Sequence, residues 1–360
     1  MKKHLIAAGV VAAFAAPAMA QNVSVYGIVD VNYSTVDYDN AGSESAMGSS
    51  ALATSRLGLR GSEDLGGGLK AEFQLEGTLI PQDGQIGKPT TKQNTYTTAT
   101  GTAQYTTTND MFDREAWAGV SGAFGAVRFG RTDVTSAVNI DAKVSQIGDL
   151  GLISELSTDQ KKSIRYTSPN FQGFQVEVGY ANPDAKTSSG GETTAKSLTN
   201  IYASYEKGPL GVYLARESQK VTQSLDQDQT TFGAKYDFGV VSVGLTYSTR
   251  DNVKYVAKDG DIAAKYDAEV GGKDLKQTVL SAAMPLANGY KLHAAYEKAD
   301  LDSNATGGTT NDLDFDSYTL AVTKSLSKRT SLYAAFISTD KELTTANDSK
   351  QYTVGIVHNF

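Results

Sequence analysis

The sequence predicts an all-β protein, a closed transmembrane β-barrel of 16 antiparallel strands. Two patterns carry this prediction. Apolar and polar residues alternate with a period of two through most of the chain, and the links between the alternating segments are short and long in turn. Of the 360 residues, 20% are charged and 40% hydrophobic. Strands that face lipid on one side and water on the other have this texture.

The first 20 residues, Met1–Ala20, differ from the rest of the chain. They combine a basic start at Lys2 and Lys3, an apolar run from Leu5 to Phe14 and the small residues Ala18-Met19-Ala20, which is typical of a secretory signal peptide. We therefore predict that residues 21–360 form one exported barrel domain. Beyond the signal, no apolar run approaches the ~20 residues that a membrane-spanning helix needs.

Charge and residue usage exclude several classes of function. Without the two lysines of the predicted signal, 31 basic residues stand against 40 acidic ones, a formal net charge of −9, so no nucleic-acid partner is expected. The chain has no cysteine, and outside the signal only His293 and His358 remain. This usage argues against a disulfide framework, a thiolate nucleophile and a Cys/His zinc site, and we expect no cofactor and no enzyme chemistry.

Individual segments show the alternation clearly. From Val23 to Tyr33, valine, glycine and tyrosine occupy one face and mostly polar residues the other. In Leu69–Glu76, four charged or amide side chains share the second face, which a soluble core could bury only at a high cost in free energy. The same period recurs in Phe232–Phe238, Val241–Ser248 and Tyr318–Thr323.

The links set the strand count. The long polar links are Ala41–Ser50, Thr78–Asp110, Thr132–Gln160, Ala181–Ser197, Gln219–Gln229, Asp251–Asp274, Asp300–Asp314 and Asp340–Lys350. The short ones are Asp64–Gly68, Gly122–Gly125, Pro169–Gly173, Lys207–Leu210, Pro285–Gly289 and Ser327–Arg329. Eight long links and a closing strand, Tyr352–Phe360, give 16 strands, with short periplasmic turns and long external loops. One segment alone also fits a soluble antiparallel sandwich, but the repeated rhythm favours the barrel, and a sheet in lipid has to close.

Several motifs resemble one family. Ser55–Glu76, Arg114–Val120, Ser163–Phe171, Val354–Phe360 and Val25–Asp30 together are similar to the general diffusion porins of Gram-negative bacteria, especially the neisserial and burkholderial branch. The resemblance implies a homotrimer in the cell outer membrane, in contact with lipid and lipopolysaccharide, whose third external loop folds inward. Such a barrel passes small hydrophilic solutes and ions by diffusion. The Pro-Glu-Phe-Gly-Gly stretch of many enteric porins is absent, and Val138–Gly151 stands in its place.

Arginines are the candidates for one wall of a constriction. Because Leu57, Leu59 and Gly61 face lipid in the predicted strand, Arg56 and Arg60 should face the lumen, and Arg128 is opposite in phase to its apolar neighbours. The resemblance places Arg114 and Arg165 as further wall arginines. Guanidinium stays ionised and several can lie side by side. The alternative is that inward arginines only balance neighbouring carboxylates.

The inward loop is the candidate for the other wall. Thr132–Gln160 holds five acidic residues against Lys143, a net charge of −4, and Asp141 and Asp149 are central in it. We expect these two carboxylates to face the arginines across the passage and to create a transverse field. An ordinary solvated loop is the alternative. The wall arginines favour anions and the acidic loop favours cations, so the sequence leaves the ion preference open.

The function that the sequence supports is a passive outer-membrane pore. An outer-membrane hydrolase would need a histidine beside a serine, and the two remaining histidines have no positioned partner in the pattern. An adhesin or structural surface protein that acts through its long external loops is the alternative.

Overall fold

The computed structural model describes residues 22–39, 41–94, 104–133, 137–150, 159–182, 186–187, 193–194, 197–220, 226–251, 273–303, 313–341 and 348–360. The predicted signal peptide lies outside these residues. Within them, no helix is both long and apolar enough to cross a membrane.

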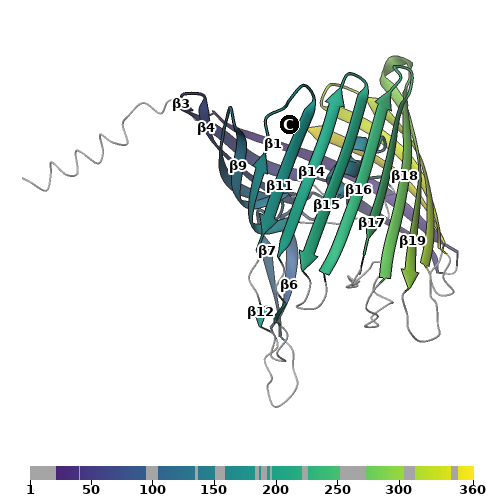
Figure 1. Cartoon of the computed structure of the whole chain (residues 1–360). Helices are drawn as coiled ribbons and strands as arrows, with labels where there is room; N and C mark the ends of the chain where they lie inside the picture. Colours follow the sequence, from purple (N-terminus) through teal and green to yellow (C-terminus); the bar gives the residue numbers. More distant parts are fainter. Residues whose placement is uncertain are drawn as a thin grey trace, which may run out of the picture.

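The described strands form one closed antiparallel barrel (Figure 1). It has 16 strands, because β2 and β3 are two halves of one strand and the two-residue β5 (Gln85–Ile86) lies outside the wall. The predicted fold class and strand number are confirmed. The barrel strands are β1 (Asn22–Tyr38), β2 (Gly42–Ser49) with β3 (Arg56–Gly66), β4 (Leu69–Ile80), β8 (Glu115–Gly122), β9 (Gly125–Asp133), β10 (Asp159–Thr167), β11 (Phe174–Ala181), β14 (Leu198–Lys207), β15 (Leu210–Lys220), β16 (Asp226–Asp237), β17 (Ser242–Arg250), β18 (Lys273–Pro285), β19 (Tyr290–Ser303), β20 (Leu313–Ser325), β21 (Thr330–Lys341) and β22 (Ser349–Asn359).

The barrel closes where β22 pairs with β1, from Ile28 opposite Asn359 to Tyr38 opposite Ser349. Just beyond this ladder, Gly27 and Phe360 exchange two backbone hydrogen bonds of 3.2 and 3.1 Å. A Cβ atom at Gly27 would lie 2.4 Å from the Phe360 ring, so glycine is needed for the ring to cover this position. The seam therefore leaves no open sheet edge, as a lipid environment requires.

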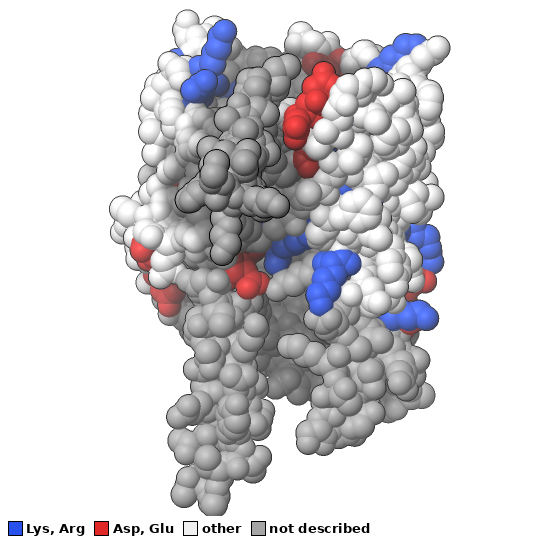
Figure 2. Space-filling view, turned by 90° about the vertical axis from the view of Figure 1, so that its left-hand side faces the viewer, with Lys and Arg blue, Asp and Glu red and all other residues white. Residues whose placement is uncertain are grey.

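The outer surface of the barrel is apolar. Val25, Phe129 and Leu320 are 61%, 54% and 59% exposed, whereas inward-facing neighbours such as Asp30 and Thr319 are buried. Figure 2 shows an uncharged belt between two bands of charged side chains on the visible face. The predicted alternation between a lipid face and a lumen face is confirmed by this pattern.

One predicted loop is a strand. Ala41–Ser50 was expected to be the first long external link, but residues 42–49 form β2 and pair with the C-terminal half of β1, from Val31 opposite Ser49 to Tyr38 opposite Gly42. The turn is short, and the barrel strand is instead interrupted after β2, at Ser50–Ser55. Glycine, serine and alanine make up most of β2, and Glu44 and Met47 are its only larger side chains, so the segment lacks the apolar face by which other strands are recognised.

The long link between β4 and β8 carries a hairpin of its own. Its strands β6 (Lys88–Asn94) and β7 (Gln104–Asp110) pair only with each other and project from the end of the barrel opposite the C-terminus (Figure 1). Two-residue strands β12 (Lys186–Thr187) and β13 (Thr193–Thr194) pair in another long link. At the opposite end the links are short, including the 3-10 turn η2 (Ala287–Gly289), as predicted.

The third long link folds into the barrel. Its helix α2 (Ala137–Val144) packs on the inner wall at β15, β16 and β17. Ile140 and Val144 are buried there against a wall that includes Tyr202, Tyr213 and Ala215. Two lumen-facing glycines make this seat possible: a Cβ atom at Gly233 would lie 2.3 Å from Ile140 Cγ2, and one at Gly244 would lie 2.2 Å from the Val144 carbonyl oxygen.

We predict that Gly233→Ala lifts α2 from the wall without opening the barrel, because the new methyl group overlaps Ile140. Single channels in planar bilayers should show a clear increase in open-state current fluctuations. Gly179→Ala is the matched control, because the nearest atom to its Cβ is 3.6 Å away. Equal current noise in the two variants would contradict the conclusion that α2 packs on the wall because position 233 has no side chain.

Candidate functional site

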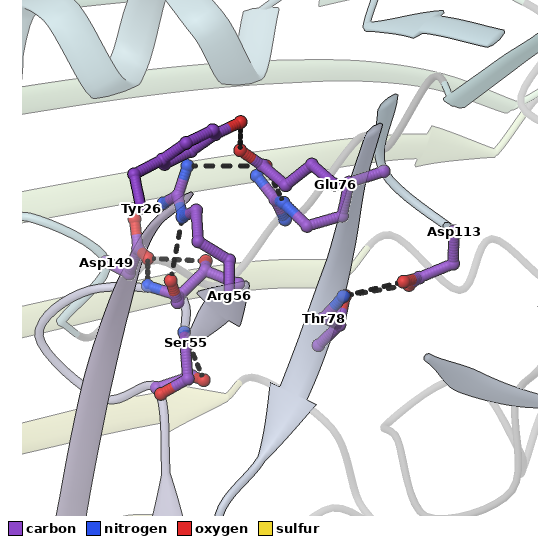
Figure 3. Close-up of polar contacts among 10 residues, drawn as sticks. Tyr26, Ser55, Arg56, Glu76, Thr78, Asp113 and Asp149 are labelled. Carbon is purple, nitrogen blue, oxygen red and sulfur yellow. Dashed lines mark hydrogen bonds and ion pairs between the residues drawn. The ribbon is translucent and has the colours of Figure 1, made fainter. Parts of the chain in front are cut away.

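Two arginines converge on one carboxylate on the lumen side of the wall. Arg114 Nε lies 2.6 Å and Arg56 Nη1 3.9 Å from Glu76 Oε1, and the Tyr26 hydroxyl donates to Glu76 Oε2 at 2.7 Å (Figure 3). Both arginine side chains stay about one-quarter exposed, at 27% and 24%, whereas Glu76 is 6% exposed. The cluster therefore presents guanidinium groups to the lumen and keeps the carboxylate behind them.

The segment before β8 is fixed to β4, and this fixes Arg114. The Arg114 backbone N–H donates to the Glu76 carbonyl oxygen at 3.1 Å. Asp113 accepts two hydrogen bonds of 2.7 Å, from the Thr78 backbone N–H and hydroxyl. Sequence reasoning did not single out Tyr26, Glu76 or Asp113. The charged face of Leu69–Glu76 was the sequence feature that could have identified Glu76 as a lumen-facing residue.

The interruption at Ser50–Ser55 forms a bulge in the second barrel strand, and this bulge leads into Arg56. Asp30 on β1 organises it: its Oδ2 atom accepts the backbone N–H groups of Leu52 at 2.7 Å and Ala53 at 2.8 Å, and its Oδ1 atom accepts the Tyr333 hydroxyl at 2.5 Å. Ser55 Oγ accepts the Asp30 N–H at 2.9 Å. Charge-assisted hydrogen bonds of this kind are the strong ones, so the bulge is held firmly.

Asp149 fastens the inward loop to this bulge. Its Oδ2 atom accepts both the backbone N–H and the hydroxyl of Thr54 at 2.8 Å, and its own N–H donates to the Leu52 carbonyl oxygen at 3.1 Å. Asp149 thus lies beside Arg56 (Figure 3). The sequence led us to expect it on the wall opposite the arginines, so its observed position differs.

Asp141 also differs from the expected position. It lies on the side of α2 that faces the barrel wall and is 6% exposed. Its carboxylate is hydrogen-bonded to Thr246 on the wall, and its Oδ1 atom has no hydrogen-bond partner. Burial raises the pKa of the Asp141 carboxyl to about 6. The carboxylate therefore faces the barrel wall and not the passage, because α2 turns its Ile140 and Val144 side toward Gly233 and Gly244.

The remaining predicted arginines face inward outside this cluster, and Arg128 and Arg165 lie opposite each other in the β9–β10 ladder. Arg165 on β10 forms an ion pair with Glu177 at 3.2 Å, and the two side chains are only 7% and 9% exposed. Arg60 lies over the Tyr26 ring at 4.9 Å and Arg128 over the Trp117 ring at 4.5 Å. The structure thus brings Arg56 and Arg114 together and keeps Arg60, Arg128 and Arg165 apart from them.

The loop between α2 and Asp149 is anchored to a third part of the wall. Gln146 donates its backbone N–H to Ser281 Oγ at 3.1 Å, and its carbonyl oxygen is hydrogen-bonded to His293 Nδ1. Ile147 and Leu150 pack in a cluster with Ala321, Tyr333 and Ala335. The described part of the loop therefore crosses from β15–β17 to the second barrel strand and narrows the lumen. The described residues contain no group of three or more acidic or histidine side chains arranged for a metal ion.

A closed strand barrel with an apolar belt, a polar lumen and a loop seated inside it defines a membrane channel. The comparisons with known proteins agree. Residues 7–344 match the Gram-negative porin family model. The chain is 32% identical to outer membrane porin protein 32 of Delftia acidovorans, over 92% of this chain and 88% of that protein. This chain belongs to the Gram-negative porin family.

Solved structures show the same fold. The anion-selective porin from Comamonas acidovorans is 27% identical, with a TM-score of 0.71, over 95% of this chain and 100% of that one. OmpT of Vibrio cholerae in its trimer form is 17% identical, with a TM-score of 0.62, over 95% of this chain and 100% of that one. The protein is thus a channel of the outer membrane that works by diffusion, as the sequence predicted.

We predict that the packing of α2 against the inner wall of the barrel becomes more stable as the pH falls from 7 to 5. The pKa of Asp141 is raised to about 6 from its ordinary value of 3.8, so the seated helix retains a proton that an unseated helix releases. Protonation therefore favours the seated state below about pH 6. Single-channel current fluctuations should decrease on acidification, and Asp141→Asn should remove this dependence. An unchanged pH dependence in the variant would show that another group is responsible.

Proposed function

We propose that this porin prefers anions and that Arg56 and Arg114 set the preference at the constriction. The observation that carries the proposal is the arrangement around Glu76, where two partly exposed guanidiniums share one buried carboxylate. In a narrow passage with walls of low dielectric constant, such an excess of positive charge acts more strongly than in bulk water.

The acidic residues of the inward loop support the same direction. Asp141 is buried against the wall, and Asp149 holds two Thr54 donors on one oxygen. Neither carboxylate lies across the lumen from the arginines, so the two described acidic residues of this loop hold the loop in place and do not face the arginines. The relative from Comamonas acidovorans is named anion-selective, which agrees with the proposal.

Reversal potentials across a potassium chloride gradient test the proposal. Arg114→Ser should shift the permeability ratio toward cations by severalfold, and Glu76→Gln should shift it toward anions. Arg165→Ser should have a smaller effect than Arg114→Ser, because Arg165 is buried in a pair with Glu177. All shifts should shrink at ~1 M salt, where the Debye length is about 3 Å. Shifts of equal sign for Arg114→Ser and Glu76→Gln would refute the assignment.

We also propose that the porin assembles as a homotrimer. The trimer form of OmpT shares its fold, and the β6–β7 hairpin offers a means of contact between barrels, since it projects from the end of the barrel (Figure 1) and pairs with no barrel strand. Links of this length usually have a function or are disordered. A hairpin that reaches a neighbouring barrel would lock the subunits together.

Replacement of residues 88–110 by a short glycine–serine linker tests this contact. We expect the temperature at which trimers dissociate in detergent gels to fall by roughly 10 °C or more. The monomer should keep its strand-rich circular dichroism spectrum, because the barrel ladder does not include the hairpin. A trimer that dissociates at the wild-type temperature would count against the hairpin as a lock.

A further inference from the structure

A small cavity opens in the lumen wall away from the Arg56–Arg114 cluster. Its volume is about 310 Å³, and it lies against β1, β3, β4, β8 and β9. The side chains that line it and matter here are Arg60, Arg128, Trp117, Gln74, Ser62 and Glu72.

The two arginines of this cavity contact aromatic rings and an uncharged side chain. Arg60 contacts the Tyr26 ring and Ser24 Oγ, the latter at 3.4 Å, and Arg128 contacts the Trp117 ring. Among the residues that the structure describes, no carboxylate forms an ion pair with either guanidinium. Arg128 Nε is buried and has no hydrogen-bond acceptor. This donor is unsatisfied, which in a buried group costs free energy.

Both guanidiniums are held in place by aromatic rings, at 4.9 Å over Tyr26 and 4.5 Å over Trp117. Arg128 reaches Trp117 across Gly119, where a Cβ atom would lie 3.1 Å from Arg128 Cγ. Tyr26 is fixed by its hydrogen bond to Glu76. A ring covers one face of a guanidinium and leaves its N–H edges available. The two cations are therefore preorganised, and little side-chain entropy remains to be lost on binding.

This cavity is separate from the constriction. Arg60 follows Arg56 by four residues on the same face of β3, which places it about 13 Å further along the strand. The displacement is toward the Gly66–Gly68 turn, and so away from Thr54, where the inward loop is fastened.

We propose that Arg60 and Arg128 form a second anion site, on the short-turn side of the constriction, for a small oxyanion such as phosphate or a monocarboxylate. A guanidinium edge can donate two parallel hydrogen bonds to a pair of oxygens of a carboxylate or a phosphate, and Gln74 and Ser62 add uncharged donors. Glu72 in the same cavity limits the net positive charge and disfavours highly charged anions. The inference deepens the proposed anion preference and rests on it.

The only tryptophan of the chain, Trp117, lies in this cavity and reports on it. Its side chain is nearly covered, at 8% exposure. We propose to compare quenching of its fluorescence by iodide, caesium and neutral acrylamide in detergent at low ionic strength. In the wild type, iodide should quench more strongly than caesium. Sodium phosphate or acetate, added at constant ionic strength against chloride, should protect the ring from iodide, and the two salts show which oxyanion binds better.

Variants identify the residues responsible. Arg60→Ser and Arg128→Ser should each lower the iodide quenching constant by about threefold or more relative to acrylamide, because a local excess of positive charge concentrates anions. Glu72→Gln should raise it. Arg216→Ser is the matched control, since this exposed arginine pairs with Asp228 and does not line the cavity, and it should leave iodide quenching unchanged. The ratio to acrylamide corrects for any change in how far the ring is covered.

Failure of this site and failure of the proposed function give different results. Unchanged iodide quenching in Arg60→Ser and Arg128→Ser, or protection by chloride equal to that by phosphate and acetate, would overturn the site even in a channel whose reversal potential shows anion preference. A wild-type channel that prefers cations would overturn the proposed function. Iodide quenching that still depends on Arg60 and Arg128 in such a channel would leave the site standing.

Discussion

The requirement that every backbone N–H and C=O group be paired in lipid determines the rest of this structure. An isolated unpaired group in hydrocarbon costs several kcal/mol, so the sheet must end where it began. The ladder between β1 and β22 and the two bonds between Gly27 and Phe360 complete it. Closure with this many strands leaves a lumen too wide for wall side chains to fill. An inward loop narrows it, and the shape of the passage therefore depends on how that loop is held.

The wall accommodates large side chains by placing glycine beside them. Tyr26 lies over Gly58, Tyr333 over Gly355 and Arg128 over Gly119, each where a Cβ atom would overlap or crowd the neighbouring side chain. Two of these residues reach across one strand to a partner on the next, since Tyr26 donates to Glu76 and Tyr333 to Asp30. Arg128 passes over Gly119 to lie on Trp117, which belongs to the same neighbouring strand β8. Gly233 and Gly244 do the same for α2. Glycine usually weakens a strand, but here the neighbouring side chain covers the position and stabilises it.

The sequence predicts which face of a strand each residue occupies, because this depends on alternation alone. It does not predict features that depend on contacts between distant segments. Arg56, Arg60 and Arg128 face the lumen as expected, because a period of two fixes the face of each residue in a strand. β2 is not recognisable from its small polar residues, since it is a strand only through its pairing with β1. The side of α2 that meets the wall depends on glycines about 100 residues away along the chain, so the burial of Asp141 could not be predicted. In the sequence, Asp30 and Glu76 look like other residues of the polar strand faces. Their roles come from contacts with the Ser50–Ser55 bulge and with Arg114, respectively, which only the folded structure shows.

The difference between the charge of the chain and the charge of its passage follows from the same contacts. The formal net charge of the whole chain is −7, but charges separated by more than a Debye length of about 8 Å at physiological salt barely interact through water. Carboxylates on the external links therefore contribute little to the field at Arg56 and Arg114. Near these arginines, Glu76 is buried behind the guanidiniums and Asp149 is held by Thr54. In the anion preference that we propose, the ions in the lumen respond to this local arrangement, in which acidic groups hold the structure together and the partly exposed arginines face the water-filled passage.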